Sequence, residues 1–377
     1  MKIAFALDTL HTTKTEKLFW IIAILWRNKM KFQTHIDFLI ENACTSIKFL
    51  VHRDFLKTPI SEPFMQIMRS EILEQENIKK HLACQHPDGW FGEELHGGEY
   101  GMERSIGTLL NAGVEIEHPA IQKAIYALIT PEIASQHKNW FHGGDGLDAD
   151  GRGGNNAIIA SILSWVGYDE SYPVLAEQIG LSWEHVEAVL GYKSVDDFTK
   201  KGKNERYYKP FARFPGANHI GLLNATKSWR TEEKMKIAKA SMKHAYELMK
   251  DFDEFITFKK PKEFGGSVVG PFNYNWRALK PVDEKKLYQI INDPYNFQFA
   301  FWLGAVSGVP EWVRQSDETY LVLADFLEKE NNLDAIPDRV FSAFRRVSGK
   351  EPNYRKRSAA KCDLTYALLR AIWNVID

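Results

Sequence analysis

Two glycine-rich loops of this chain carry imidazole and carboxylate side chains in the same order. Each loop contains His-Gly-Gly followed by an acid, and these groups are His96 and Glu99 in the first loop and His142 and Asp145 in the second. Paired glycines let a backbone approach a ligand closely, and an imidazole beside a carboxylate can share acid and base roles. The pattern predicts a site for general acid–base chemistry.

The second loop adds two more acids, Asp148 and Asp150. Three acids beside one turn repel one another unless a cation or a partner offsets their charge. His96, His142 and Asp145 would offer the nitrogen and oxygen ligands that suit zinc, manganese or iron, so a divalent metal is one candidate cofactor. The structural alternative is that these turns cap helices and that the histidines bond to the backbone.

The apolar residues around these loops recur at helical spacing. Ile36, Leu39, Ala43, Ile47 and Leu50 predict one buried helix face, and the same rhythm recurs over residues 238–249 and 364–375. Sustained alternation of apolar and polar residues is scarce. The sequence therefore predicts an all-α protein.

A helix, a glycine stop, a short loop and a proline-started helix occur twice with the same spacing. The glycines are Gly113 and Gly167, and the prolines that follow them six residues later are Pro119 and Pro173. Glycine tolerates the left-handed end of a helix, and proline suits the first helical position. Weaker echoes of the pattern lie at residues 220–249 and 299–327. The helix over residues 157–166 is apolar on all sides, which predicts an inner helix.

The segment Gln85–Gly92 reads Gln-His-Pro-Asp-Gly-Trp-Phe-Gly, and together with the helix that follows it resembles the repeat of squalene cyclases and protein prenyltransferases. In that superfamily a Gln-x-x-Asp-Gly-x-(Trp/Phe)-Gly loop precedes each inner helix. The resemblance covers residues 81–180. It implies an α/α toroid of helical hairpin repeats, with the glycine-rich loops on one rim of a central cavity. It also implies an isoprenoid-like or other partly apolar substrate.

The sequence departs from the chemistry of that superfamily at two places. Class II terpene cyclases protonate an alkene with an Asp-x-Asp-Asp motif, but the corresponding helix here starts with Asn155 and Asn156, and asparagine is not a strong proton donor. These two residues are instead candidates for substrate binding. Prenyltransferases bind zinc through Asp, Cys and a distant His, whereas no suitable histidine follows Cys362 and Asp363. A buried cysteine is the better interpretation there.

Other charged and aromatic residues precede helices or lie in late loops, and they are further candidates for substrate binding. They are Arg104, Arg213, His219, Tyr274, Trp276 and Arg277. The late aromatic loop could stack on a sugar or on an isoprenoid, and core packing is the structural alternative.

The bulk properties exclude some partners. The 377 residues are 44% hydrophobic and carry a formal charge of −1, which gives no support for binding to nucleic acid or to an acidic membrane. Three cysteines without a CxxC spacing predict reduced thiols and a cytoplasmic protein.

The apolar segment 18–26 is about half as long as a membrane-spanning helix, so no integral span is predicted. Residues 1–30 are predicted to be an N-terminal extension, disordered or loosely docked, with an interfacial anchor or a signal as alternatives. Residues 31–377 are predicted to form a single toroid domain.

The sequence thus predicts an enzyme that uses acid–base or metal-assisted chemistry on a small-molecule substrate of isoprenoid-like or partly apolar character. Two alternatives stay open. One is a carbohydrate-active lyase or hydrolase built on an α/α toroid, and the other is a toroid that binds a ligand without catalysis.

Overall fold

The computed structural model describes residues 32–137, 144–149, 151, 153–202, 206–249, 256–257, 350–351 and 357–376, together with Lys285, Gln289, Phe326, Leu327, Lys329 and Ile336. These residues are mostly helical, which confirms the all-α prediction. None of the described helices is both long and apolar enough to cross a membrane.

Contacts divide the chain into two compact units. Unit 1 comprises residues 1–58, 281–307 and 311–377, and unit 2 comprises residues 59–280 and 308–310. The predicted extension over residues 1–30 lies outside the described residues, and the single domain over residues 31–377 stays a prediction.

Unit 1 contains three described helices, α3 (Gln33–Asn42), α4 (Thr45–Asp54) and α22 (Arg357–Ile376). Helix α22 packs against both α3 and α4. The sequence predicted one continuous helix face over residues 36–50, but the chain breaks at Ala43 and Cys44, whose backbones are extended. The break is stabilised from outside the helices, because the Glu351 carboxylate accepts a hydrogen bond from the Cys44 backbone N–H at 2.7 Å.

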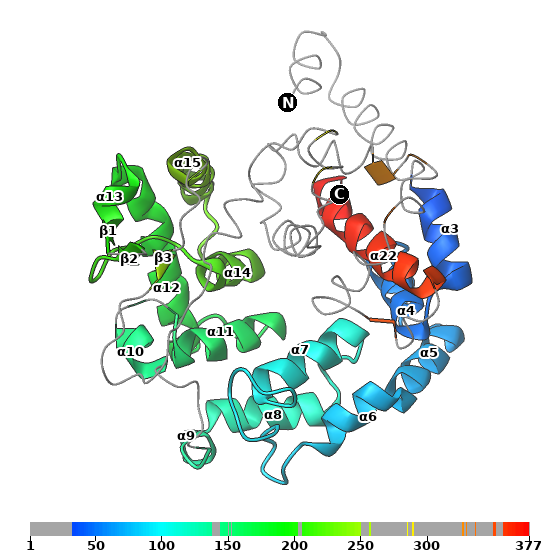
Figure 1. Cartoon of the computed structure of the whole chain (residues 1–377). Coiled ribbons are helices and arrows are strands. Elements are labelled where there is room, and N and C mark those ends of the chain that lie inside the picture. Colours follow the sequence, from blue (N-terminus) through cyan, green and yellow to red (C-terminus); the bar gives the residue numbers. More distant parts are fainter. Residues whose placement is uncertain are drawn as a thin grey trace. The chain divides into compact units, whose positions relative to one another are not determined.

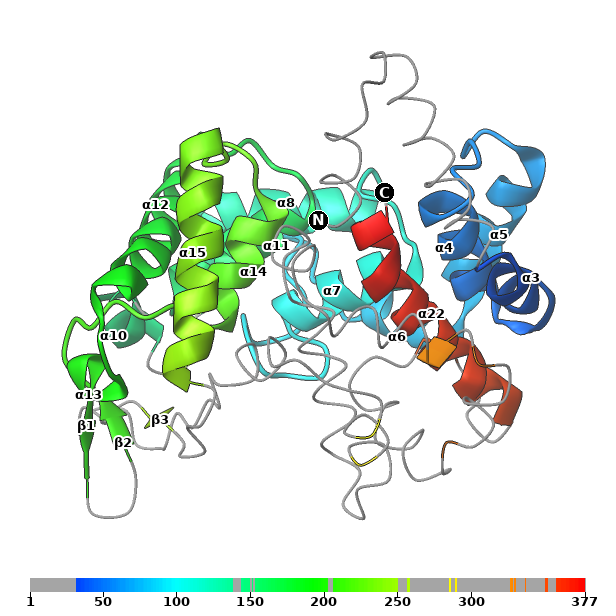
Figure 2. The same ribbon diagram turned by 90° about the horizontal axis from the view of Figure 1, so that it is seen from above.

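Unit 2 is a succession of helices. They are α5 (Pro63–Glu74), α6 (Glu76–Ala83), α7 (Met102–Ala112), α8 (Pro119–Ile129), α9 (Pro131–Ala134), α10 (Gly144–Ala149), α11 (Asn155–Trp165), α12 (Pro173–Ala188), the 3-10 helix η1 (Val189–Gly191), α13 (Val195–Phe198), α14 (Ala217–Ala225) and α15 (Glu232–Met249). Helices α7, α11 and α14 follow one another in space, and α11 contacts both of its neighbours (Figure 1). Helices α12 and α15 run side by side (Figure 2), and α12 also packs on α11 and α14.

The predicted helix boundaries of the repeat are confirmed. Helix α7 ends at Gly113, whose φ of 99° lies in the left-handed region, and α8 begins at Pro119. Helix α11 is followed by Gly167, with φ of 64°, and α12 begins at Pro173. Most side chains of α11 are buried, as its apolar composition predicted. The two hairpins therefore start and stop for the same local reasons.

The Gln85–Gly92 loop links the end of α6 to the start of α8 through side-chain hydrogen bonds. The Gln85 side chain donates hydrogen bonds to the carbonyl of Gly89 at 3.0 Å and to that of Ala120, in the first turn of α8, at 2.7 Å. The Trp90 ring is buried and stacks on His137 with centroids 4.5 Å apart. These contacts stabilise the position of the loop between α6 and α8.

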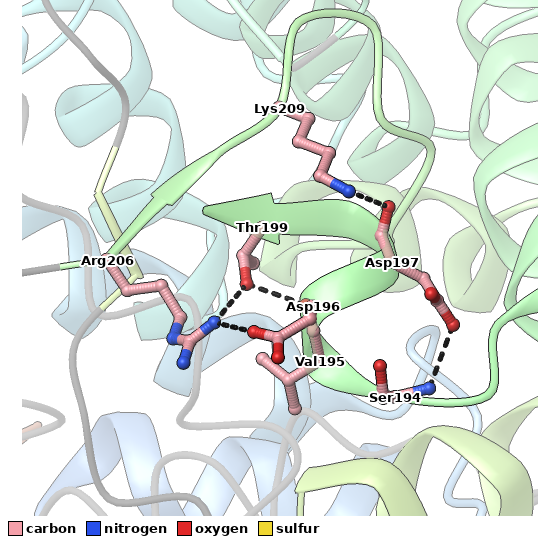
Figure 3. Close-up of polar contacts among 7 residues, drawn as sticks. All are labelled: Ser194, Val195, Asp196, Asp197, Thr199, Arg206 and Lys209. Carbon is pink, nitrogen blue, oxygen red and sulfur yellow. Dashed lines mark hydrogen bonds and ion pairs between the residues drawn. The ribbon is translucent and has the colours of Figure 1, made fainter. Parts of the chain in front are cut away.

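A small sheet follows α13, in the order β1 (Thr199–Lys201), β2 (Arg206–Tyr208) and β3 (Ile256–Thr257). Strands β1 and β2 are antiparallel, and β2 and β3 are parallel. A capping box of Ser194 and Asp197 begins α13. Arg206 reaches back from β2 to the Asp196 carboxylate and to the Thr199 hydroxyl (Figure 3). These strands are too short for the alternating pattern that would have predicted them.

Candidate functional site

The second glycine-rich loop is attached to the N-terminus of α11 by Asp148. One carboxylate oxygen of Asp148 accepts the backbone N–H of Gly154 and the other accepts that of Asn156, each at 2.9 Å. A side chain at Gly154 would overlap the carbonyl oxygen of Gly144 and lie 2.7 Å from the Asp148 carboxylate. Glycine at position 154 has no side chain, so the loop can pack closely enough for Asp148 to accept the first N–H groups of α11. The N-terminus of a helix is a favourable position for a negatively charged carboxylate.

Asp145 lies one helical turn before Asp148 and is exposed. Its carboxylate accepts a hydrogen bond of 2.8 Å from the Asn155 side-chain amide. Asn155 is only 4% exposed, and its side-chain oxygen is buried without a hydrogen-bond partner in the described part of the chain. An exposed carboxylate is therefore oriented by a buried amide.

The two acids have different surroundings. Burial raises the pKa of Asp148, and the nearby charge of Asp145 raises it further, against the lowering effect of the backbone N–H groups. Asp145 remains at the surface. Pairs of carboxyl groups with such different environments are the usual basis for dividing acid and base roles.

A guanidinium and an imidazole lie on the other side of the loop. A β-carbon at Gly151 would lie 2.6 Å from the Arg213 Nη1 and 3.7 Å from the His185 Cε1, so both groups adjoin this turn. Arg213 is half-buried, and its Nη2 lies 3.4 Å from the Glu184 carboxylate, which is itself more than half exposed. Its charge is only partly neutralised by this exposed partner.

His185 and His219 are both buried, and their rings are stacked with centroids 4.1 Å apart and an interplanar angle of 17°. The His185 Nδ1 lies 2.9 Å from the Leu181 carbonyl, which can only accept, so this nitrogen donates. The His219 Nδ1 accepts the backbone N–H of Gly216 at 3.0 Å. When both rings are neutral, the Nε2 of His185 is therefore an acceptor and the Nε2 of His219 is a donor.

His185 was not among the residues that the sequence predicted for the site. A signal was present, because Gln178, Ser182 and His185 are polar residues at helical spacing and all three are buried on α12. A polar stripe on the buried face of a helix requires partners inside the protein. Here His219, which was predicted, is one of the contacting groups.

The structure brings six of the predicted site residues to the N-termini of α11 and α14. These are Asp145, Asp148, Asn155, Asn156, Arg213 and His219. Asn156 contributes its backbone N–H. His142, Asp150, Tyr274, Trp276 and Arg277 lie outside the described residues, so convergence of the two His-Gly-Gly loops stays a prediction.

In the first His-Gly-Gly loop the histidine contacts a residue close to it in the sequence. The His96 Nδ1 pairs with the Glu103 carboxylate of α7, and this hydrogen bond raises the pKa of His96. Glu99 and Arg104 are exposed. Among the residues with described positions, no three His, Cys, Asp or Glu side chains are grouped so as to hold a metal ion.

No family model matches the chain, and no curated protein or solved structure matches it.

Proposed function

We propose that unit 2 carries the active site of an enzyme that acts by general acid–base chemistry on a small hydroxylated, sugar-like substrate. The site is the loop between α10 and α11 together with the start of α14. Asp145 is the reacting carboxylate, Asp148 is the second acid of the pair, and Arg213 binds a polar or anionic group of the substrate. The observation that carries the proposal is the exposed Asp145 carboxylate, which the buried Asn155 amide holds beside a second acid of raised pKa.

The toroid is part of this proposal. The contacts of α11 with α7 and α14, and of α12 with α11 and α15, support a curved succession of inner and outer helices. In such an arrangement the loops that precede the inner helices share one rim. A cavity there would give Asp145 and Arg213 a common substrate.

The exposed faces of the three inner helices favour a hydroxylated substrate over an isoprenoid. The side chains exposed on these helices include Arg104 and Asn111 on α7, Trp165 on α11 and Asn218 on α14, and the half-buried ones include Thr108 and Ser161. Most of them carry groups that can donate or accept hydrogen bonds, and a tryptophan is a platform on which a sugar ring can lie. An isoprenoid chain would instead require an apolar lining, so the carbohydrate-type alternative has the better support.

The test is Asp145→Asn, which preserves shape and the contact with Asn155. Wild-type protein and variant are incubated with a panel of neutral and acidic oligosaccharides and with farnesyl and geranylgeranyl diphosphate. Binding is followed by calorimetry and products by mass spectrometry. We expect an oligosaccharide to bind both proteins with similar affinity, and turnover by the variant to be at least about 100-fold slower.

The matched control is Glu233→Gln on α15, an exposed acid that belongs neither to the α10–α11 loop nor to the start of α14, and its turnover should equal that of the wild type. Turnover of a prenyl diphosphate without binding of any saccharide would overturn the substrate assignment. Full activity of Asp145→Asn would overturn the role of Asp145. Saccharide binding by the wild type without any product would instead indicate a non-catalytic binding protein.

A further inference from the structure

An exposed phenylalanine occupies a backbone conformation that glycine normally adopts. The Ala212 N–H donates to the Lys209 carbonyl at 3.1 Å, which closes a turn with Pro210 second and Phe211 third. Phe211 has φ of 59° and is 69% exposed. Proline followed by a residue of positive φ is the pattern of a type II turn, where the third position favours glycine or asparagine. The phenyl ring thus adds backbone strain and gains little burial in the free protein.

Four exposed lysines lie near this turn in the sequence, and two of them belong to the small sheet. They are Lys193 before α13, Lys200 and Lys201 on β1, and Lys209 at the start of the turn. We call these four lysines and Phe211 the basic finger.

The neighbouring acids have contacts of their own, and Lys209 is one of the partners, because its Nζ donates to the Asp197 carbonyl at 3.2 Å. Arg206 pairs with Asp196, and the Asp197 carboxylate accepts the backbone N–H of Ser194 (Figure 3). The same carboxylate also accepts the backbone N–H of Lys193. Within the described residues no carboxylate pairs with Lys200 or Lys201. Among the described residues the finger therefore carries a local excess of positive charge, although the chain as a whole has a formal charge of −1.

The turn is fixed to the body of unit 2. The Lys209 N–H donates to the Phe198 carbonyl at 3.0 Å, and the rings of Phe198 and Phe214 are stacked 4.1 Å apart. On the far side of the turn the Arg213 N–H donates to the Tyr192 hydroxyl at 3.1 Å. The backbone is therefore anchored on both sides of the turn that carries Phe211.

We propose that the basic finger binds the surface of an anionic lipid membrane, with the Phe211 ring in the interfacial layer and the lysines on the lipid headgroups. A membrane interface offers a negative surface and an apolar layer directly beneath it, so it accommodates both features of the finger. An acidic polysaccharide would engage the lysines but would bury little of the phenyl ring. Single-stranded nucleic acid could engage both, and it is the competing outcome of the test. This inference is independent of the proposed function.

The experiment is co-sedimentation of the full chain with vesicles of phosphatidylcholine alone or with one quarter phosphatidylserine. We expect binding to the anionic vesicles only, weakened by salt. Lys200→Gln with Lys201→Gln should lower the partition coefficient about 30-fold, since each lysine near an anionic surface contributes about fivefold. Phe211→Asn should lower it about tenfold, because the apolar contact is lost.

Phe211→Asn also separates binding from folding. Asparagine tolerates positive φ, so the variant should melt at the same temperature as the wild type or above it while binding vesicles more weakly. The matched controls are Lys239→Gln with Lys243→Gln, two exposed lysines of α15, and Tyr126→Asn, which removes an exposed aromatic ring of α8. These controls should bind vesicles as the wild type does.

Three results would overturn the proposal. One is the absence of binding to anionic vesicles, and another is equal loss of binding in the α15 control. The third is tight binding of an oligo(dT) strand that excludes vesicles, which would assign the finger to nucleic acid.

Discussion

The stacked rings of His185 and His219 have opposite hydrogen-bond roles at their Nδ1 atoms, one donating to a carbonyl and the other accepting an N–H. Two positive charges about 4 Å apart cost about 4 kcal/mol at an effective dielectric constant of 20. The pair should therefore carry at most one positive charge between pH 5 and 8.

Nitrogen-15 NMR correlation spectra of the imidazoles check this prediction. We expect the Nδ1–H form of His185 and the Nε2–H form of His219 at neutral pH, with at most one ring titrating on acidification. Two fully protonated rings at pH 6 in the folded protein would contradict the stacked arrangement.

Gly154 and Gly180 should respond to alanine with opposite signs. A methyl group at Gly154 would overlap the Gly144 carbonyl. At Gly180, inside α12, no described atom beyond the backbone of its own helix lies within 4 Å of an added β-carbon. We expect Gly154→Ala to lower the free energy of unfolding by about 3 kcal/mol or more and Gly180→Ala to raise it by up to about 1 kcal/mol. Urea denaturation followed by circular dichroism measures both, and a neutral Gly154→Ala would mean that the loop is not packed on α10.

The contact of His96 with Glu103 should make stability depend on pH. The hydrogen bond to Glu103 raises the pKa of His96, so the folded state binds the proton more tightly than the unfolded state. The stabilisation is fully present below the ordinary histidine pKa of about 6.5 and is lost as pH rises through the raised value. Since His96 is 43% exposed, the contribution is below about 1 kcal/mol.

Glu103→Gln should therefore lower the melting temperature by a few degrees or less at pH 5.5 and by less at pH 9. The control is the same substitution in a His96→Asn background, where it should have no pH-dependent effect. An equal loss of stability at both pH values would show that the ion pair is not the cause.

Two of the three cysteines should be inert towards alkylation in the folded protein. Burial raises the pKa of Cys44 to about 12 and that of Cys362 to about 12. At pH 8 the thiolate fraction of each is then about 10⁻⁴, and the thiolate is the reactive form. Iodoacetamide labelling with peptide mass spectrometry should modify Cys84 first. Rapid labelling of Cys44 or Cys362 without denaturant would contradict their raised pKa values.

The sequence predicted those features that depend on residues close together in the chain. Gly113 and Pro119 stop and start helices through their own backbone properties, so the boundaries of the repeat followed directly. The break between α3 and α4 did not, because Glu351 accepts the Cys44 N–H from a distance of 307 positions along the chain. Apolar spacing alone could not reveal that partner.

The candidate site was predictable in part for the same reason. Asp148 and Asn156 are eight positions apart, and the glycines between them predicted a tight turn in front of a helix. The roles were less predictable, since Asp148 holds two N–H groups of α11 and leaves Asp145 as the exposed acid. His185 was missed because its neighbour His219 belongs to another helix.

Unit 1 is formed by segments that lie before and after unit 2 in the sequence, and this affects the order in which the two units can fold. The Tyr366 hydroxyl of α22 donates to Asp54 of α4 at 3.1 Å, across 312 positions of sequence. During synthesis α3 and α4 emerge first but lack the helix that buries them, whereas the helices of unit 2 find their neighbours as they appear. Ribosome-bound chains that stop before residue 357 should therefore have a folded unit 2 and an α3–α4 segment that proteases still cleave.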